Sequence, residues 1–132
     1  METASGPPDA PLVLVVDDHE DGREILSELL VASGYRSVAL GTAKAALAEL
    51  DLLAPDAVII DIGLPDMDGF ELATTLRARR DVPVVAYTGY ADAATYDLAR
   101  EAGCCAVLVK CVGVATVLST IKDVVSRRSE PA

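Results

Sequence analysis

The sequence predicts an α/β fold in which helices cover both faces of a parallel sheet. Two observations support this prediction: apolar runs alternate with segments of helical spacing, and most of the runs are continuous in Val, Ile, Leu and Ala. Continuous apolar runs are typical of strands that are covered on both faces. Right-handed crossovers between such strands place the intervening helices on both sides of the sheet.

The predicted strands are the five apolar runs, residues 12–16, 38–40, 57–60, 82–87 and 106–109. Helical spacing fills the segments between and after them, residues 20–33, 43–53, 68–79, 92–102 and 114–127. The order of elements is therefore a strand followed by a helix, repeated along the chain.

Each helix has its own signals. In the first, Ile25, Leu26, Leu29 and Leu30 form one apolar stripe, and Gly34 is a natural stop. The second and the last carry apolar positions predicted to face inward, Ala46, Leu47, Leu50 and Leu53 in one and Val114, Val117, Leu118, Ile121, Val124 and Val125 in the other. Asp68 and Glu71 form a capping box that predicts the start of the third helix. Asp92 is the predicted cap at the start of the fourth helix, and Gly103 ends it.

Length and composition indicate one domain with short tails. The chain has 132 residues, and we expect a disordered tail over residues 1–11, a domain over 12–127 and a second tail over 128–132. The formal net charge is −10, from 11 basic and 21 acidic residues, which disfavours direct binding to nucleic acid. No window resembles a signal peptide or a membrane span, so we expect a soluble cytoplasmic protein.

The three cysteines, Cys104, Cys105 and Cys111, do not form a disulfide pattern, because their number is odd and two are adjacent. A zinc site would need more Cys or His partners than His19 alone. We expect reduced thiols that pack as small apolar groups.

Polar side chains stand where the predicted strands end. Asp17 and Asp18 follow the first strand, Asp61 the third, Thr88 the fourth and Lys110 the fifth. Ligands of such sheets bind outside the carboxyl ends of the strands, so these side chains are expected to meet. Three converging carboxylates repel one another, so either some take up protons or a cation lies among them, and hard oxygen ligands favour Mg²⁺.

The same set suits phosphoryl transfer. Its transition state spreads negative charge over three oxygens, which a metal ion, a hydroxyl and a lysine can each stabilise, while a carboxylate in line acts as the nucleophile. Taken one at a time, these residues have simpler interpretations as a helix cap, a turn residue, an exposed lysine or an ordinary strand-end hydroxyl. Their joint position favours the site.

The pattern resembles the receiver domain of two-component response regulators from about residue 12 to residue 126. The matching motifs are Asp17-Asp18, the stretch from Asp61 to Gly69 that reads DIGLPDMDG, Thr88-Gly89, and Ala102-Gly103 leading to Lys110. The resemblance implies a flavodoxin-like (βα)5 sheet in the strand order 2-1-3-4-5. It also implies a phosphoprotein that switches a protein-binding surface in signal transduction and has no independent substrate turnover.

Further roles follow from the resemblance. Asp61 would be the phosphoacceptor. Asp18, Asp61 and the backbone carbonyl of Gly63 would ligate Mg²⁺ directly, and Asp17 would act largely through water. Thr88 and Lys110 would bind phosphoryl oxygens. The donor would be a phosphohistidine on a histidine kinase or a phosphotransfer protein, and the output would go to another protein or to a fused kinase or output domain.

Two residues depart from the family pattern. Cys111 stands where Pro usually follows the lysine. A cis bond to a non-proline residue costs roughly 2.5–4 kcal/mol. We therefore predict that the Lys110–Cys111 bond is trans or strained and that the loop before the last helix is shifted. Val107 stands where a switching Tyr or Phe is common, and Tyr87 and Tyr90, which flank Thr88, are the alternative reporters.

Other functions are weighed on single residues. The two departures would suit a phosphorylation-independent interaction module of receiver fold. A phosphatase of the haloacid dehalogenase type is disfavoured, because it needs a second Asp where Gly63 stands. A flavin-binding protein is disfavoured because Asp17-Asp18 would repel the flavin phosphate. A P-loop nucleotide-binding protein is disfavoured because no P-loop motif is present. His19 is expected to be an exposed residue rather than a proton shuttle, and the resemblance alone implies that it contacts a kinase partner together with Glu20 and Arg23.

Overall fold

The computed structural model describes residues 6–129. Strands and helices alternate through this range, as predicted. Their bounds are β1 Leu12–Val16, α1 Glu20–Ala32, β2 Arg36–Leu40, α2 Ala43–Leu53, β3 Ala57–Asp61, α3 Gly69–Arg79, β4 Val84–Thr88, α4 Ala93–Glu101, β5 Ala106–Val109 and α5 Val114–Ser129.

The strands form one parallel sheet in the order β2-β1-β3-β4-β5. This confirms the predicted fold class and strand order. β1 and β3 lie at the centre, and every residue of both is buried. From β1 the chain first adds β2 on one side, and it then adds β3, β4 and β5 on the other side. The carboxyl ends of β1 and β3 therefore border the crevice where ligands of such folds bind.

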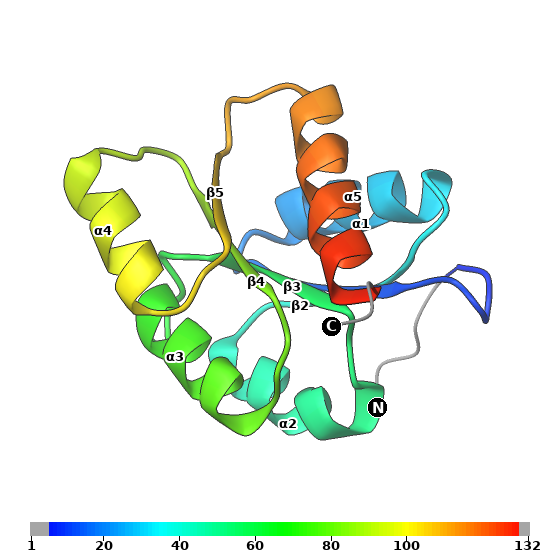
Figure 1. The fold of residues 1–132 in the computed structure, drawn as a ribbon, viewed down its shortest axis with the longest axis horizontal. Helices are drawn as coiled ribbons and strands as arrows, with labels where there is room; N and C mark the ends of the chain where they lie inside the picture. The colour runs from blue at the N-terminus through cyan, green and yellow to red at the C-terminus, as the bar shows by residue number, and fades with distance from the viewer. Residues whose placement is uncertain (1–5, 130–132) are drawn as a thin grey trace.

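Helices cover both faces of the sheet (Figure 1). α1 and α5 lie together on one face, where Leu26, Leu30 and Ile121 pack against alternate residues of the central strands. α2 and α3 cover the other face with Leu50, Leu72 and other buried side chains. The continuous apolar runs therefore arise because successive strand residues face two separate cores.

Two predicted core positions are wrong. Ile25 in α1 is 65% exposed and Val114 in α5 is 54% exposed, although both were assigned to inward stripes. The buried stripe of α1 is narrower than predicted, since only Leu26 and Leu30 are fully buried. Val114 is the first residue of α5, and burial in this helix begins at Val117.

The strand bounds differ from the prediction in three strands. β2 begins at Arg36, two residues earlier than predicted, and β4 ends one residue later, at Thr88. The start of β4 has a clear reason. β4 begins at Val84, two residues later than predicted, because Pro83 has no amide hydrogen for the sheet and the Val82 amide bonds the carbonyl of Arg80 instead. β3 continues one residue further than predicted, through Asp61, whose register partner on β4 is Tyr87.

The helix ends follow capping chemistry. The side chains of Thr42, Asp68 and Asp92 accept backbone N–H bonds at the starts of α2, α3 and α4. Asp68 bonds the amide of Phe70 rather than that of Glu71, so the cap is at the predicted residue but is not the predicted capping box. Gly34 and Gly103 have φ values of 99° and 89°, the left-handed region that ends a helix.

Part of the predicted N-terminal tail belongs to the described residues. Arg36 donates from Nε to the carbonyl of Ala10 and from its amide to that of Pro11. The predicted domain limits stay a prediction, and residues 1–5 and 130–132 lie outside the described range. Within residues 6–129, no helix has the length and apolar character needed to cross a bilayer.

Candidate functional site

Three strand ends bring carboxylates and a lysine to one edge of the sheet. Asp61 is the last residue of β3, Asp17 follows β1, and Lys110 follows β5. Backbone bonds fix these positions: the Asp17 amide donates to the carbonyl of Leu40, and the Lys110 amide donates to that of Thr88 at 2.7 Å. The parallel register thus sets where each side chain leaves the sheet.

The carboxylates form a compact cluster. Asp17, Asp18 and Asp61, together with His19, each offer a ligand atom within 4.8 Å of the others. Asp17 and Asp61 are 2% and 6% exposed, while Asp18 and His19 are exposed. Burial makes the repulsion between two of these charges costly, so the cluster requires positive charge nearby.

Lys110 supplies some of that charge. Its Nζ lies 3.0 Å from Asp61 Oδ2 and 3.3 Å from Asp17 Oδ2. Partial burial lowers the pKa of Lys110, but the hydrogen bond to Asp61 and the charge of Asp17 outweigh it, so its pKa is raised. Nζ also lies 5.5 Å from the centre of the Tyr87 ring, within range of a cation–π contact.

The pKa of Asp17 moves the other way. Burial raises the pKa, but the His19 amide bond and the charge of Lys110 are among the interactions that lower it, and the net direction is down. Asp17 therefore stays ionised despite its burial, which keeps negative charge beside Asp61.

His19 is exposed, as predicted, but its ring does more than face solvent. Nδ1 lies 3.2 Å from Asp17 Oδ1 and 3.1 Å from Asp18 Oδ1. This contact was not predicted from the sequence. Its position directly after two strand-end aspartates was the signal that could have found it.

Thr88 and Gly63 reach the same edge without sharing the cluster. Thr88 is the last residue of β4, and its hydroxyl donates to the carbonyl of Tyr90, two residues further on, at 3.0 Å. The amide of Gly63 donates to Asp61 Oδ1 at 3.1 Å and so orients the carboxylate. A ligand role for the Gly63 carbonyl stays a prediction.

Gly69, which the sequence marks only as the end of the motif that begins at Asp61, is a positioning residue. A β-carbon there would lie 2.5 Å from Ile62 Cα and 2.8 Å from the carbonyl oxygen of Asp61. The Gly69 amide also donates to the carbonyl of Ile62. The start of α3 thus packs directly on the backbone that carries Asp61, which a larger residue would displace.

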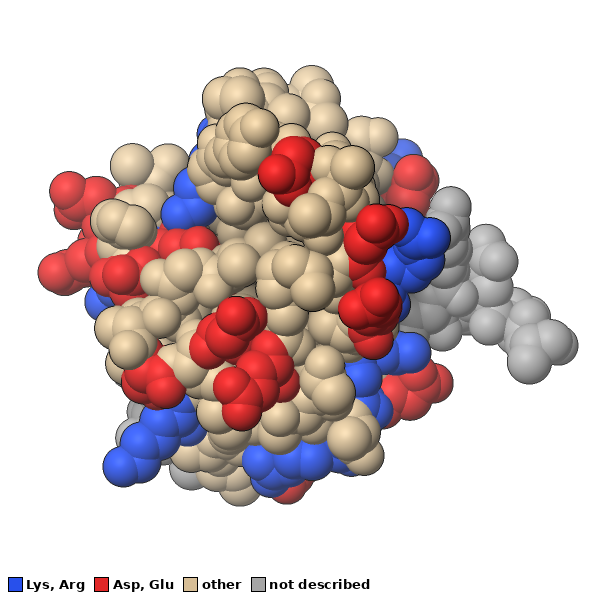
Figure 2. Space-filling view, turned by 90° about the vertical axis from the view of Figure 1, so that its left-hand side faces the viewer, with Lys and Arg blue, Asp and Glu red and all other residues tan. Residues whose placement is uncertain are grey.

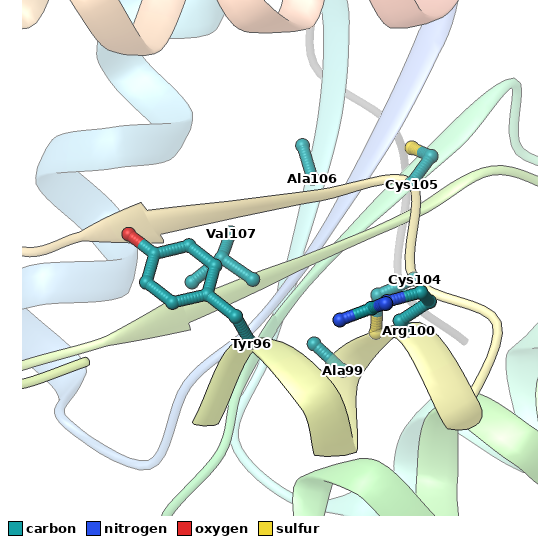
Figure 3. Close-up of a pocket in the computed structure, with 7 residues that line it drawn as sticks. All are labelled: Tyr96, Ala99, Arg100, Cys104, Cys105, Ala106 and Val107. Atoms are coloured by element: carbon teal, nitrogen blue, oxygen red, sulfur yellow. The ribbon is translucent and has the colours of Figure 1, made fainter. Parts of the chain in front are cut away.

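The two departures from the family pattern have structural counterparts. Val107 of β5 and Tyr96 of α4 both line a pocket of about 390 Å³, completed by Ala99, Arg100, Cys104, Cys105 and Ala106 (Figure 3). Cys111 follows a trans bond, as predicted, since no peptide bond among residues 6–129 is cis. The predicted shift of the loop after it stays untested.

Cys104 lies deepest of the thiols. Burial is the main reason that the pKa of Cys104 is raised to about 11. The neighbouring Cys105 also raises this pKa, and the positive charge of Arg77 lowers it. A thiol with such a pKa stays protonated at neutral pH, which agrees with the predicted packing role of Cys104. Cys105 and Cys111 are exposed, so the prediction that they pack as small apolar groups is wrong.

The donor set fits Mg²⁺. Carboxylate oxygens of three aspartates converge at the sheet edge, two of them buried, and the lysine balances only one charge. Mg²⁺ is held through one or two carboxylates and keeps open positions for phosphate oxygens. Asp18 and Asp61, with Asp17 beside them, are the residues that would hold it.

The fold and the site define a doubly wound parallel α/β domain with an acidic cluster at the strand ends and a lysine beside it. The family model of the response regulator receiver domain matches residues 13–122. The chain belongs to this family. Receiver domains of this family generally accept a phosphoryl group and bind Mg²⁺ at an acidic pocket.

Curated relatives agree with this assignment. Transcriptional regulatory protein PdtaR of Mycobacterium tuberculosis (strain ATCC 25618 / H37Rv) is 33% identical over 119 residues, which cover 89% of this chain. The match spans only 58% of PdtaR. Polar-differentiation response regulator DivK of Brucella abortus (strain 2308) is 32% identical over 117 residues, covering 84% of this chain and 93% of DivK.

Solved structures share the fold. The CheY-like receiver domain protein from Methanospirillum hungatei JF-1 superimposes with a TM-score of 0.86 at 27% identity, over 91% of this chain and 97% of that one. Chemotaxis protein CheY4 of Vibrio cholerae gives a TM-score of 0.83 at 27% identity, over 87% and 98%.

Proposed function

We propose that this chain is the phosphoacceptor of a two-component phosphorelay, with Asp61 accepting the phosphoryl group. The observation that supports it most is the placement of Lys110 Nζ 3.0 Å from Asp61 Oδ2, beside the Asp17 and Asp18 carboxylates. A buried carboxylate with a lysine on one oxygen and further carboxylates beside it to hold a metal ion suits attack on phosphorus.

In the proposed reaction, a carboxylate oxygen of Asp61 attacks the phosphorus of a phosphohistidine. A P–O bond forms as the P–N bond breaks, and the electron pair of the P–N bond stays on the leaving imidazole nitrogen. Lys110 would move its hydrogen bond from the carboxylate to a phosphoryl oxygen. Mg²⁺, held by Asp18 and Asp61, would supply positive charge that stabilises the negative charge on the phosphoryl oxygens.

Thr88 would bind another phosphoryl oxygen. To do so, its hydroxyl must give up the bond to the Tyr90 carbonyl. Tyr90 is 74% exposed, so this exchange would move a residue on the surface of the domain. The contact supports Tyr90 as a reporter of phosphorylation in a chain that has Val107 at the usual aromatic position.

The partners are proposed by family. A histidine kinase or phosphotransfer protein would be the donor, and the output would go to another protein or a fused domain, since PdtaR, a transcriptional regulatory protein, extends well beyond the matched region. The acidic charge disfavours nucleic acid as the direct target.

On the face drawn in Figure 2, acidic groups lie amid a mostly uncharged surface, with Lys and Arg toward its margins. A cytoplasmic location and the absence of independent turnover stay predictions.

Phosphorylation by a small acyl phosphate tests the proposal without a kinase. With Mg²⁺, the intact mass should rise by one phosphoryl group, and Asp61→Asn or removal of the metal with EDTA should abolish the gain. Glu71→Gln, which removes an exposed carboxylate from the first turn of α3, should behave like the wild type.

A phosphorylation-independent interaction module is the second candidate, and Val107 and Cys111 are the observations that favour it. It predicts no mass gain from either an acyl phosphate or a kinase. Partner capture would then be equal for the wild type and Asp61→Asn.

A further inference from the structure

His19, the chain's single histidine, occupies the N-cap of α1 but does not cap the helix with its side chain. N-cap side chains usually accept a bond from an amide of the first turn, which an imidazole does poorly. The His19 ring instead lies over the carboxylate cluster, although 72% of the side chain is exposed. The ring is therefore available to whatever the cluster binds.

The distances resemble those between ligands of one cation. His19 Nδ1 lies 3.1 Å from Asp18 Oδ1 and 3.2 Å from Asp17 Oδ1, and 3.9 Å from Asp61 Oδ2. Neighbouring ligands of an octahedral ion with bonds of about 2.1 Å are about 3.0 Å apart, and opposite ligands are about 4.2 Å apart.

Lys110 leaves this side of the cluster open. Its Nζ contacts Asp17 through Oδ2, whereas His19 faces Oδ1 of the same carboxylate. Only Asp61 Oδ2 is near both groups. A cation on the His19 side would thus have nitrogen and oxygen donors without displacing the lysine from Asp17.

An imidazole nitrogen ligand changes which metal ions a site prefers. Mg²⁺ selects oxygen ligands, whereas imidazole suits the divalent first-row transition metals, whose affinity for mixed sites rises from Mn²⁺ toward Cu²⁺. We propose that His19 Nδ1 is a ligand of the cation held by Asp18 and Asp61, and that the site therefore prefers Mn²⁺ and later transition metals to Mg²⁺. The inference rests on the metal site of the proposed function and deepens it.

Pulsed electron paramagnetic resonance of bound Mn²⁺ tests the ligand directly. Protein without a polyhistidine tag has one imidazole, so any imidazole ¹⁴N coupling must come from His19. The coupling should be present in the wild type and absent in His19→Gln. Bound Mn²⁺ without nitrogen coupling in the wild type would overturn the inference.

Metal competition tests the preference. Free Mn²⁺ measured during titration, with and without Mg²⁺, gives both affinities. His19→Gln should weaken Mn²⁺ binding by about tenfold or more while changing Mg²⁺ binding less than twofold. Glu20→Gln, which removes the neighbouring charge outside the cluster, should change both affinities by the same small factor.

The two proposals fail differently. Equal losses for both metals in His19→Gln, or no loss, would overturn the nitrogen-ligand inference and leave the phosphoacceptor proposal standing. Failure of the wild type to bind either metal would overturn the inference together with the metal dependence of the proposed function.

Discussion

Lys110 Nζ lies 3.0 Å from Asp61 Oδ2, although the two residues are 49 positions apart in the sequence. They leave the carboxyl ends of β3 and β5, which are separated in the sheet by β4. The lysine side chain spans that strand and passes the ring of Tyr87, where its Nζ also makes a cation–π contact.

Lys110→Ala should destabilise the metal-free protein. The substitution leaves the buried Asp17 and Asp61 carboxylates without their cation, at a cost of about 1–3 kcal/mol in the free energy of unfolding. Mg²⁺ should restore part of the loss, because it also supplies positive charge. Urea unfolding in EDTA and in Mg²⁺ measures both effects.

Lys122→Ala, in the exposed part of α5, is the matched control and should change the free energy of unfolding by less than about 0.5 kcal/mol. Equal stability of Lys110→Ala and the wild type in EDTA would contradict the electrostatic account of the cluster.

Gly69→Ala should also destabilise the fold. Alanine normally stabilises a helix relative to glycine by about 0.5–1 kcal/mol, but here its β-carbon would collide with Ile62 and the Asp61 carbonyl. We expect a net loss of about 1–3 kcal/mol by thermal or urea unfolding. Gly89→Ala, which has open space around its β-carbon, should be close to neutral. A stabilised Gly69→Ala protein would show that α3 does not press on the acceptor backbone.

Asp66 gives a prediction for pH dependence. Hydrogen bonds from the Ala43 and Lys44 amides lower the pKa of Asp66 below its ordinary value. A carboxyl whose pKa is lowered on folding stabilises the protein above its unfolded pKa, and that stabilisation disappears as pH falls through the folded pKa.

Asp66→Asn should therefore be less stable than the wild type at pH 7, and the difference should shrink below about pH 4. Unfolding free energies measured from pH 3 to pH 7 check the trend. A difference that is constant over this range would rule out the ionised carboxylate as the stabilising group.

Val107→Tyr should be tolerated. Val107 is half-buried and lines the pocket beside α4, so a larger ring has space to enter (Figure 3). We expect the free energy of unfolding to change by less than about 1 kcal/mol. A larger loss would mean that the pocket closes in solution around Tyr96 and Val107.

The sequence was sufficient to predict Asp17, Asp61 and Lys110 as neighbours. Continuous apolar runs mark where buried strands end, and a parallel sheet brings those ends to one edge. The structure agrees, because each of the three leaves the sheet within one residue of a strand end.

Other features depended on packing that periodicity does not encode. Ile25 carries the helical spacing of a core residue, yet it is exposed, and the buried positions of α1 are Leu26 and Leu30. The His19 ring could turn to solvent or toward the carboxylates, and the sequence does not distinguish these rotamers. Gly69 is required by a close backbone approach that only coordinates reveal.

Chemical mapping of the acceptor tests the central claim most directly. After phosphorylation with an acyl phosphate and Mg²⁺, borohydride converts an aspartyl phosphate to homoserine, which peptide mass spectrometry can assign to one residue. The account predicts conversion at Asp61 alone. Conversion at Asp17, Asp18 or any other carboxylate, or at none, would contradict it.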